Sequence, residues 1–202
     1  MGIFNNQKNN VVEMSQRQLL QNKYVSACNN ILWVVLFTTI NIILLVTNSN
    51  TYFLFSAYIP YLLADLGMLF CGKYPAEIYT EELVDLPILS DSFLVVTLGI
   101  AAVILVLYFL SWVFSKKQKR GWLIFALAFF SIDTLALIFL NGFLVESIID
   151  YVFHAWVIIC LVSGLVSFSK LKKLPAEDES KLPFEQPVLQ TADSSYSDEL
   201  TK

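Results

Sequence analysis

Two ionisable side chains, Asp133 and His154, lie within long apolar stretches of this 202-residue chain. A carboxylate and an imidazole can exchange a proton near neutral pH, and together they could hold a cation. Asp150 precedes His154 by four residues, so on a helix the two share a face and the carboxylate can orient the imidazole. Asn41 and Thr97 are polar residues in two further apolar runs. These five residues form the candidate site, and they could handle protons or a small ligand.

The same residues also have a structural interpretation, which the sequence favours. A buried Asp–His hydrogen bond can serve only to fix the register of two helices. Catalysis is the least favoured alternative, because the chain contains no G-x-S-x-G serine motif, no H-E-x-x-H zinc pair and no G-x-G-D motif. A single histidine rules out a multi-histidine metal site. We therefore expect no enzyme activity, no metal and no cofactor.

The composition indicates the environment of the candidate site. Hydrophobic residues make up 56% of the chain, charged residues 15%, and the mean hydropathy is +0.63. Soluble domains are about 25% charged, so this chain has too few charges to cover a surface that faces water. The composition excludes a soluble enzyme, a disordered protein and a disulfide-rich secreted domain. It indicates an integral membrane protein, without nucleic-acid partners because no basic patch of that kind is present.

Four apolar runs are long enough to cross the hydrocarbon core as helices, which takes about 20 residues. They cover residues 27–47, 92–115, 122–141 and 148–168. At about 1.5 Å per residue, each run places one polar residue in the same outer-leaflet layer. Those residues are Asn41, Thr97, Asp133 and His154. We therefore predict an all-α, polytopic membrane protein, with an antiparallel bundle of four transmembrane helices over residues 27–168.

Cations gather beside the ends of these runs and predict the orientation of the chain by the positive-inside rule. The three clusters are Lys8, Arg17 and Lys23; Lys116, Lys117, Lys119 and Arg120; and Lys170, Lys172 and Lys173. The two remaining connections contain one cation, Lys73. We therefore expect the N-terminus, the C-terminus and the 116–120 loop to be cytoplasmic. This loop could also bind anionic lipid headgroups, although orientation alone accounts for its charge.

The segment 51–70 competes as a fifth span, because it is apolar and long enough. Pro60 and Asp65 interrupt it, and a fifth span would place the 116–120 loop outside, against the charge pattern. Its many aromatic residues are of the types that favour the membrane–water boundary. We therefore predict an interfacial or re-entrant element within an outer loop of residues 48–91. Its short helix is expected to begin near Pro60 and to end at Gly67.

The two ends of the chain differ in composition from the spans. Residues 1–26 carry a few apolar residues among polar ones, which predicts a cytoplasmic amphipathic helix leading into the first span. Residues 169–202 form the tail, and from Pro175 onward it has seven acidic residues and two lysines, a net charge of −5. A tail that is acidic and rich in Pro and Ser is typical of disorder, and an anionic inner leaflet would repel it into the cytoplasm.

The small residues of the chain suggest packing rather than redox chemistry. Cys28, Cys71 and Cys160 are far apart and form no C-x-x-C pair, so we interpret them as separate small apolar side chains. Cys160 and Gly164 make a small-x-x-x-small step, with Ser163 and Ser167 making another. Such steps favour close helix packing, either within one chain or between chains.

Three segments resemble small, uncharacterised four-span membrane proteins of Gram-positive bacteria. They are YFLFSAYIPYLLADLGMLFCGKYPAEIY, WVFSKKQKRGWLIFALAFFSIDT and DYVFHAWVI. The resemblance implies a bacterial cytoplasmic membrane and brings no activity or cofactor with it. The sequence therefore predicts a non-enzymatic membrane component that self-associates or assembles with a larger complex. The alternative is a small transporter, channel or sensor that uses the Asp/His site for protons or a cation.

Overall fold

The computed structural model describes residues 16–49, 51–53, 56–79, 87–142 and 148–174. Within these ranges the chain is all-helical and contains no strand. Its elements are α1 (Gln16–Val46), α2 (Tyr58–Phe70), the 3-10 turn η1 (Ala76–Ile78), α3 (Asp91–Lys116), α4 (Arg120–Asn141) and α5 (Ile148–Leu171). The first half of the expected amphipathic helix and most of the acidic tail lie outside the described residues.

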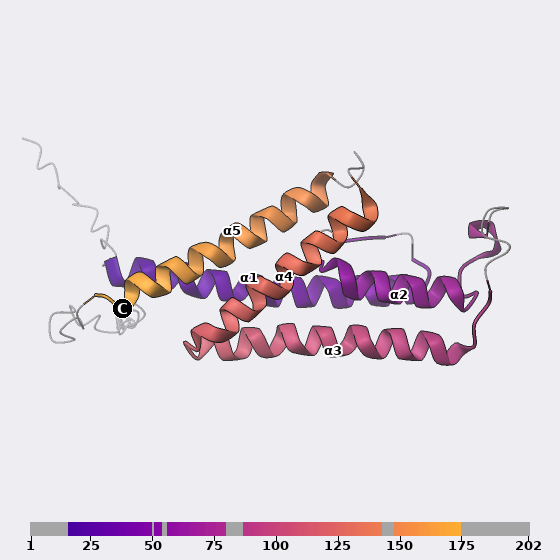
Figure 1. Ribbon diagram of the computed structural model, residues 1–202, viewed down its shortest axis with the longest axis horizontal. Helices are drawn as coiled ribbons and strands as arrows, with labels where there is room; N and C mark the ends of the chain where they lie inside the picture. The colour runs from indigo at the N-terminus through magenta and orange to yellow at the C-terminus, as the bar shows by residue number, and fades with distance from the viewer. Residues whose placement is uncertain (1–15, 50, 54–55, 80–86, 143–147, 175–202) are drawn as a thin grey trace, which may run out of the picture.

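Four helices, α1, α3, α4 and α5, are long and apolar enough to cross a membrane. They alternate in direction along the chain, so the predicted antiparallel bundle is confirmed (Figure 1). Their ends agree with the predicted spans to within three residues, apart from the start of α1. Residues 16–26 continue the first span as one unbroken helix. We call the end of the bundle where α1 begins, α3 ends, α4 begins and α5 ends the basic end.

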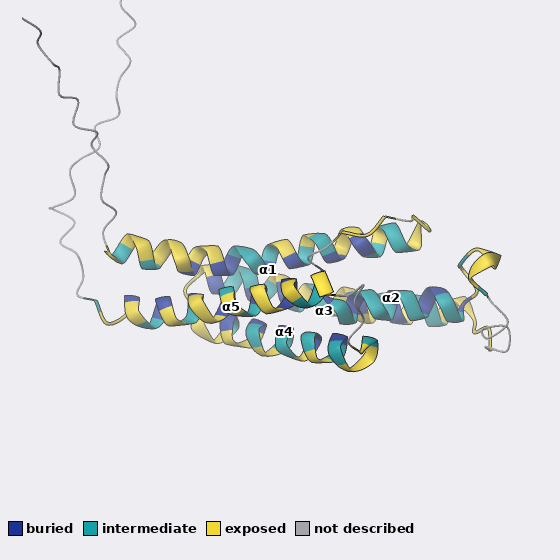
Figure 2. Ribbon diagram, turned by 90° about the horizontal axis from the view of Figure 1, so that it is seen from above, coloured by how far each residue is buried: buried dark blue, intermediate teal, exposed yellow. Residues whose placement is uncertain are grey.

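The outward faces of the helices are apolar, as lipid requires. Large hydrophobic side chains are exposed along every long helix, for example Ile43, Val95, Phe139 and Ile159. The buried face of each long helix turns toward the other helices (Figure 2). Polar residues lie on these buried faces, among them Asn41, Thr97, Asp133 and His154. The interior is therefore the more polar side of the bundle, which is the arrangement expected of chains that cross lipid.

Glycine sets two of the closest helix contacts. A Cβ added at Gly164 of α5 would lie 2.3 Å from the Cβ of Ala27 in α1. A Cβ added at Gly67 of α2 would lie 2.2 Å from the Oγ1 of Thr97 in α3. The small-residue step at Gly164 is therefore used for packing within the chain.

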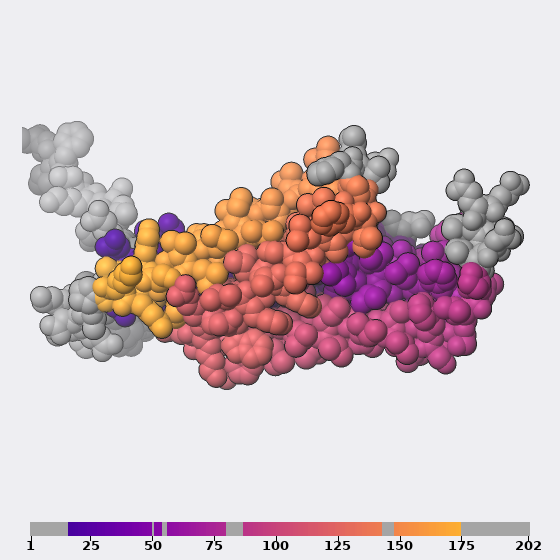
Figure 3. Space-filling view, in the orientation of Figure 1, coloured from indigo at the N-terminus to yellow at the C-terminus, as the bar shows by residue number. Residues whose placement is uncertain are grey.

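Helix α2 is re-entrant with respect to the bundle. Phe53 bonds to Asn41 and Ala57 bonds to Thr38, so the chain leaves the end of α1 and returns alongside it toward the middle of the bundle. From there α2 runs out again, and it reaches, together with the start of α3, beyond the α4–α5 hairpin (Figures 1 and 3).

The observed α2 is longer than the predicted Pro60–Gly67 helix at both ends. Pro60 lies in the first turn, where a missing N–H costs nothing. Gly67 does not end the helix, because it is buried at the contact with α3. Gly72 follows the helix with a φ of +63°, and Lys73 N–H closes the end by donating to Met68 O at 2.9 Å.

Candidate functional site

The Asp133 carboxylate of α4 binds the first turn of α2. Its side chain is buried, and the residue is 1% exposed. Oδ2 accepts the N–H of Tyr58 and Oδ1 accepts the N–H of Ile59, both at 2.8 Å. The first N–H groups of a helix have no partner within the helix, and the helix dipole makes this end positive. Asp133 therefore caps α2 from a different helix, and its ionised form has the sign of charge that this end of a helix favours.

His154 of α5 completes the environment of this carboxylate. Its Nε2 lies 3.3 Å from Asp133 Oδ2, and its Nδ1 lies 2.8 Å from the backbone oxygen of Asp150. A carbonyl oxygen can only accept, so Nδ1 carries a hydrogen and donates it. The contact between Nε2 and Oδ2 then requires one further proton, held by either the imidazole or the carboxyl group. In both cases the pair as a whole is neutral, which suits a buried site.

Two residues of α1 hold the chain just before α2. Asn41 Nδ2 donates to Phe53 O at 2.6 Å, and Asn41 Oδ1 accepts Phe53 N–H at 2.8 Å. Thr38 Oγ1 accepts Ala57 N–H at 2.7 Å and donates to Val34 O at 2.6 Å. Each of these side chains thus supplies the partner that an extended backbone needs inside a bundle.

The predicted site residues separate into two groups. Asn41 and Asp133 bond to the chain at Phe53 and at residues 58–59, and His154 joins them through its contact with Asp133. Thr97 lies elsewhere, because its hydroxyl donates to Leu94 O on its own helix and contacts α2 at Gly67. Asp150 contributes its backbone oxygen to the imidazole, where the sequence suggested its carboxylate.

Sequence reasoning missed Thr38 as a member of this site. Threonine within a helix commonly donates to the carbonyl four residues earlier, and Thr39 and Thr134 do the same. The sequence therefore held no signal that distinguished Thr38 from these residues. A second missed contact is the hydroxyl of Tyr58, which donates to Asn141 Oδ1 at 2.8 Å.

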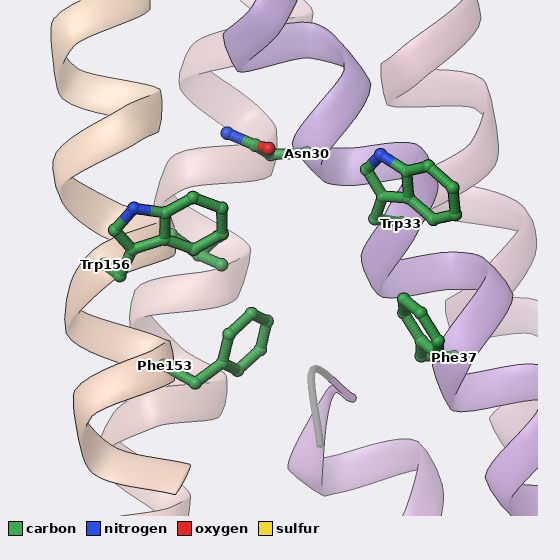
Figure 4. A pocket seen from close by; sticks show the side chains of 6 residues that line it. Asn30, Trp33, Phe37, Phe153 and Trp156 are labelled. Carbon is green, nitrogen blue, oxygen red and sulfur yellow. The ribbon is translucent and has the colours of Figure 1, made fainter. Parts of the chain in front are cut away.

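Neither of the two main cavities found among the described residues is lined by Asp133 or His154. A groove of about 150 Å³ lies between α1 and α5, lined by Asn30, Trp33, Phe37, Phe153, Trp156 and Val157 (Figure 4). A narrow internal space is lined in part by Tyr108 and Phe130. Phe130 stacks on the His154 ring, with centroids 5.0 Å apart. Aromatic rings therefore lie between the Asp–His pair and that internal space.

The far end of α2 is fixed by a second set of polar contacts. Lys73 Nζ lies 2.8 Å from Asp91 Oδ1 at the start of α3, and this carboxylate raises the pKa of the lysine. The Tyr74 hydroxyl donates to the Asp65 carboxylate. Burial, together with that hydrogen bond, raises the pKa of Tyr74 well above its ordinary value. The re-entrant helix is thus held at both of its ends.

The fold and the site define the class of the protein: an all-helical membrane protein in which buried polar residues hold the shorter helix α2 against a bundle of four long apolar helices. Within the described ranges, no group of three or more His, Cys, Asp or Glu residues is placed to hold a metal ion. No protein-family model, no curated protein and no solved structure matches the chain.

Proposed function

We propose that the chain is a non-enzymatic component of a bacterial cell membrane that assembles with itself or with a larger membrane complex. One observation carries the proposal: polar side chains of the interior bond to the backbone of Phe53 and of residues 57–59. Asp133 accepts two N–H groups, and Thr38 accepts one. Asn41 bonds to both the N–H and the carbonyl oxygen of Phe53. We infer that their role is to position α2 within the bundle, which requires neither a substrate nor a transported ion.

Native mass spectrometry of the gently extracted chain tests this proposal. We expect a species heavier than one chain, either an oligomer or a complex with a co-purified protein. Asp133→Asn weakens the hold on α2 and should reduce the heavier species. Asp150→Asn makes the same chemical change at a side chain that makes no hydrogen bond to α2 within the described residues, and it should leave the assembly intact. A clean monomer under several mild detergents would count against an assembly role.

We further propose that both termini and the turn between α3 and α4 face the cytoplasm. The supporting observation is the basic end, since cations favour the cytoplasmic side. A membrane-impermeant maleimide tests it in a chain whose native cysteines are replaced by alanine. Glu77→Cys should react in intact cells, whereas Lys117→Cys should react only after permeabilisation. The reverse pattern would invert the orientation. Both positions are exposed, so burial does not limit either reaction.

A second candidate function is proton handling, and the two hydrogen bonds of the His154 imidazole favour it. The contact between the imidazole and Asp133 requires one proton that either partner can hold. Proteoliposomes with a pH gradient provide the test. A proton flux that Asp133→Asn abolishes supports this function. A flux equal to that of protein-free vesicles rules it out and leaves the assembly role.

A further inference from the structure

The basic end of the bundle presents cations from all four long helices. They are Lys23 of α1, Lys116 at the end of α3 and the adjacent Lys117, Lys119 and Arg120 at the start of α4, Lys170 in the last turn of α5, and Lys172 and Lys173 just after it. All of these side chains are exposed. The sequence has no Asp or Glu within 16–49, 112–132 or 151–174. The described part of this end therefore has positive charge and no carboxylate to neutralise it.

Aromatic rings hold several of these lysines close to the bundle. Lys116 Nζ lies 5.0 Å from the centre of the Trp112 ring, and Lys172 Nζ lies 5.1 Å from that of Phe168. Lys119 Nζ lies 5.0 Å from the Phe114 ring. An ammonium group is attracted to the face of an aromatic ring at these distances. The positive charges are therefore held at the level of the aromatic side chains, which is the level of lipid headgroups in a membrane.

The helices that carry these lysines are joined into one surface. Tyr24 of α1 donates from its hydroxyl to Ser115 O of α3 at 2.6 Å, and its ring packs on Phe168 of α5 at 4.9 Å. Phe114 of α3 stacks on Trp122 of α4 at 4.7 Å. Because these contacts fix the helix ends relative to one another, the lysines form a preorganised cationic surface rather than separate charges.

We propose that the basic end binds the headgroups of anionic phospholipids such as phosphatidylglycerol. Charge complementarity selects an anion, and the lysines supply donors for phosphate oxygens. The neighbouring side surface is apolar, with Ile124 and Phe125 of α4 exposed. A ligand that joins a phosphate to acyl chains contacts both surfaces at once, whereas a free phosphate contacts only the lysines. The inference does not depend on the assembly role or on which side of the membrane this end faces.

The full chain in neutral detergent provides the test, with bound lipid counted by native mass spectrometry. Phosphatidylglycerol is titrated in parallel with phosphatidylcholine of the same acyl chains. Each cation near an anionic surface contributes about fivefold in affinity. We expect phosphatidylglycerol to bind at least about tenfold tighter than phosphatidylcholine. Replacing Lys116, Lys119 and Lys172 together by Gln should weaken its binding about 100-fold, while replacing the same three by Arg should retain it.

Matched controls separate the alternatives. Lys73→Gln removes a cation at the opposite end, where Asp91 already pairs with it, and should leave lipid binding unchanged. Equal affinity for the two lipids in the unaltered chain, or an unchanged affinity in the triple Gln variant, would overturn the proposal. If inorganic phosphate displaces phosphatidylglycerol when both are present at the same concentration, the basic end is a site for free anions instead. If removing residues 175–202 raises the affinity for phosphatidylglycerol tenfold or more, the acidic tail and not lipid is the occupant of the basic end in the full chain, which would overturn the proposal.

Discussion

Replacing Asp133 by Asn tests the central contact of the structure, because the change keeps the shape of the side chain and replaces one of its two acceptor oxygens by a donor NH₂ group. The new NH₂ group can donate to a neutral His154 if it takes the place of Oδ2. The remaining oxygen still accepts Ile59 N–H, and Tyr58 N–H is left without an acceptor. A hydrogen bond to a charged group contributes about 1.5–3 kcal/mol, and an unsatisfied buried N–H costs about 1–3 kcal/mol. We expect α2 to lose about 2–4 kcal/mol of its hold on the bundle.

Thiol labelling measures this loss at α2 alone. Cys71 directly follows α2, is 6% exposed, and donates to Ser90 O, so its labelling rate rises when α2 detaches from α3 as one unit. A loss of 2–4 kcal/mol raises the population of such open states by about 30- to 1000-fold, and the Cys71 labelling rate should rise accordingly. Cys28 is 0% exposed in the bundle core and should stay protected, as an internal control.

Two outcomes would refute the reasoning about Asp133. The first is a Cys71 labelling rate in Asp133→Asn no higher than in the unaltered chain. The second is equal acceleration at Cys71 and Cys28, because the carboxylate would then stabilise the whole bundle and not α2 in particular. Asp150→Asn serves as the matched control, since His154 takes the backbone oxygen of Asp150 and keeps it.

Three further changes have defined expectations. Gly164→Ala should lower the melting temperature, at a cost of about 1–3 kcal/mol, because its Cβ would lie 2.3 Å from that of Ala27 and force α1 from α5. Tyr108→Phe should leave the melting temperature unchanged or raise it, because the buried hydroxyl has no hydrogen-bond partner among the described residues. The Lys73–Asp91 pair raises the lysine pKa above 10.5, so its stabilisation should be present below pH 10.5 and fade above it. The Cys71 labelling rate, measured as a function of pH, should show this loss of stabilisation. In Lys73→Met the loss should be absent.

The long helices could be predicted from sequence because their signal is local. Run length and hydropathy placed the ends of α3, α4 and α5 within three residues, since lipid requires a continuous apolar helix. The bounds of α2 could not be predicted so well. Its start depends on a carboxylate 75 residues away, and Gly67 is a contact with α3 rather than a helix end.

The candidate site was predictable only in part. Counting residues placed Asn41, Thr97, Asp133 and His154 in one layer, but a layer does not tell which side chains face one another. Thr97 lies against Gly67, eight residues beyond Ile59 along α2, whereas Asn41 bonds to Phe53 and Asp133 bonds to Tyr58 and Ile59. His154 contacts Asp133. The backbone N–H groups that Asp133 binds have no sequence signature, because every residue except proline carries one.

The cap on α2 also constrains the order in which the protein can be made. Tyr58 leaves the ribosome 75 residues before the side chain that binds its N–H. When α1 and α3 have entered the membrane, the first turn of α2 still has no carboxylate to accept its N–H groups. Only the entry of α4 supplies it, and α5 then brings the imidazole. The α4–α5 hairpin is synthesised last, so the contacts that hold the first turn of α2 form only after the rest of the bundle has been made.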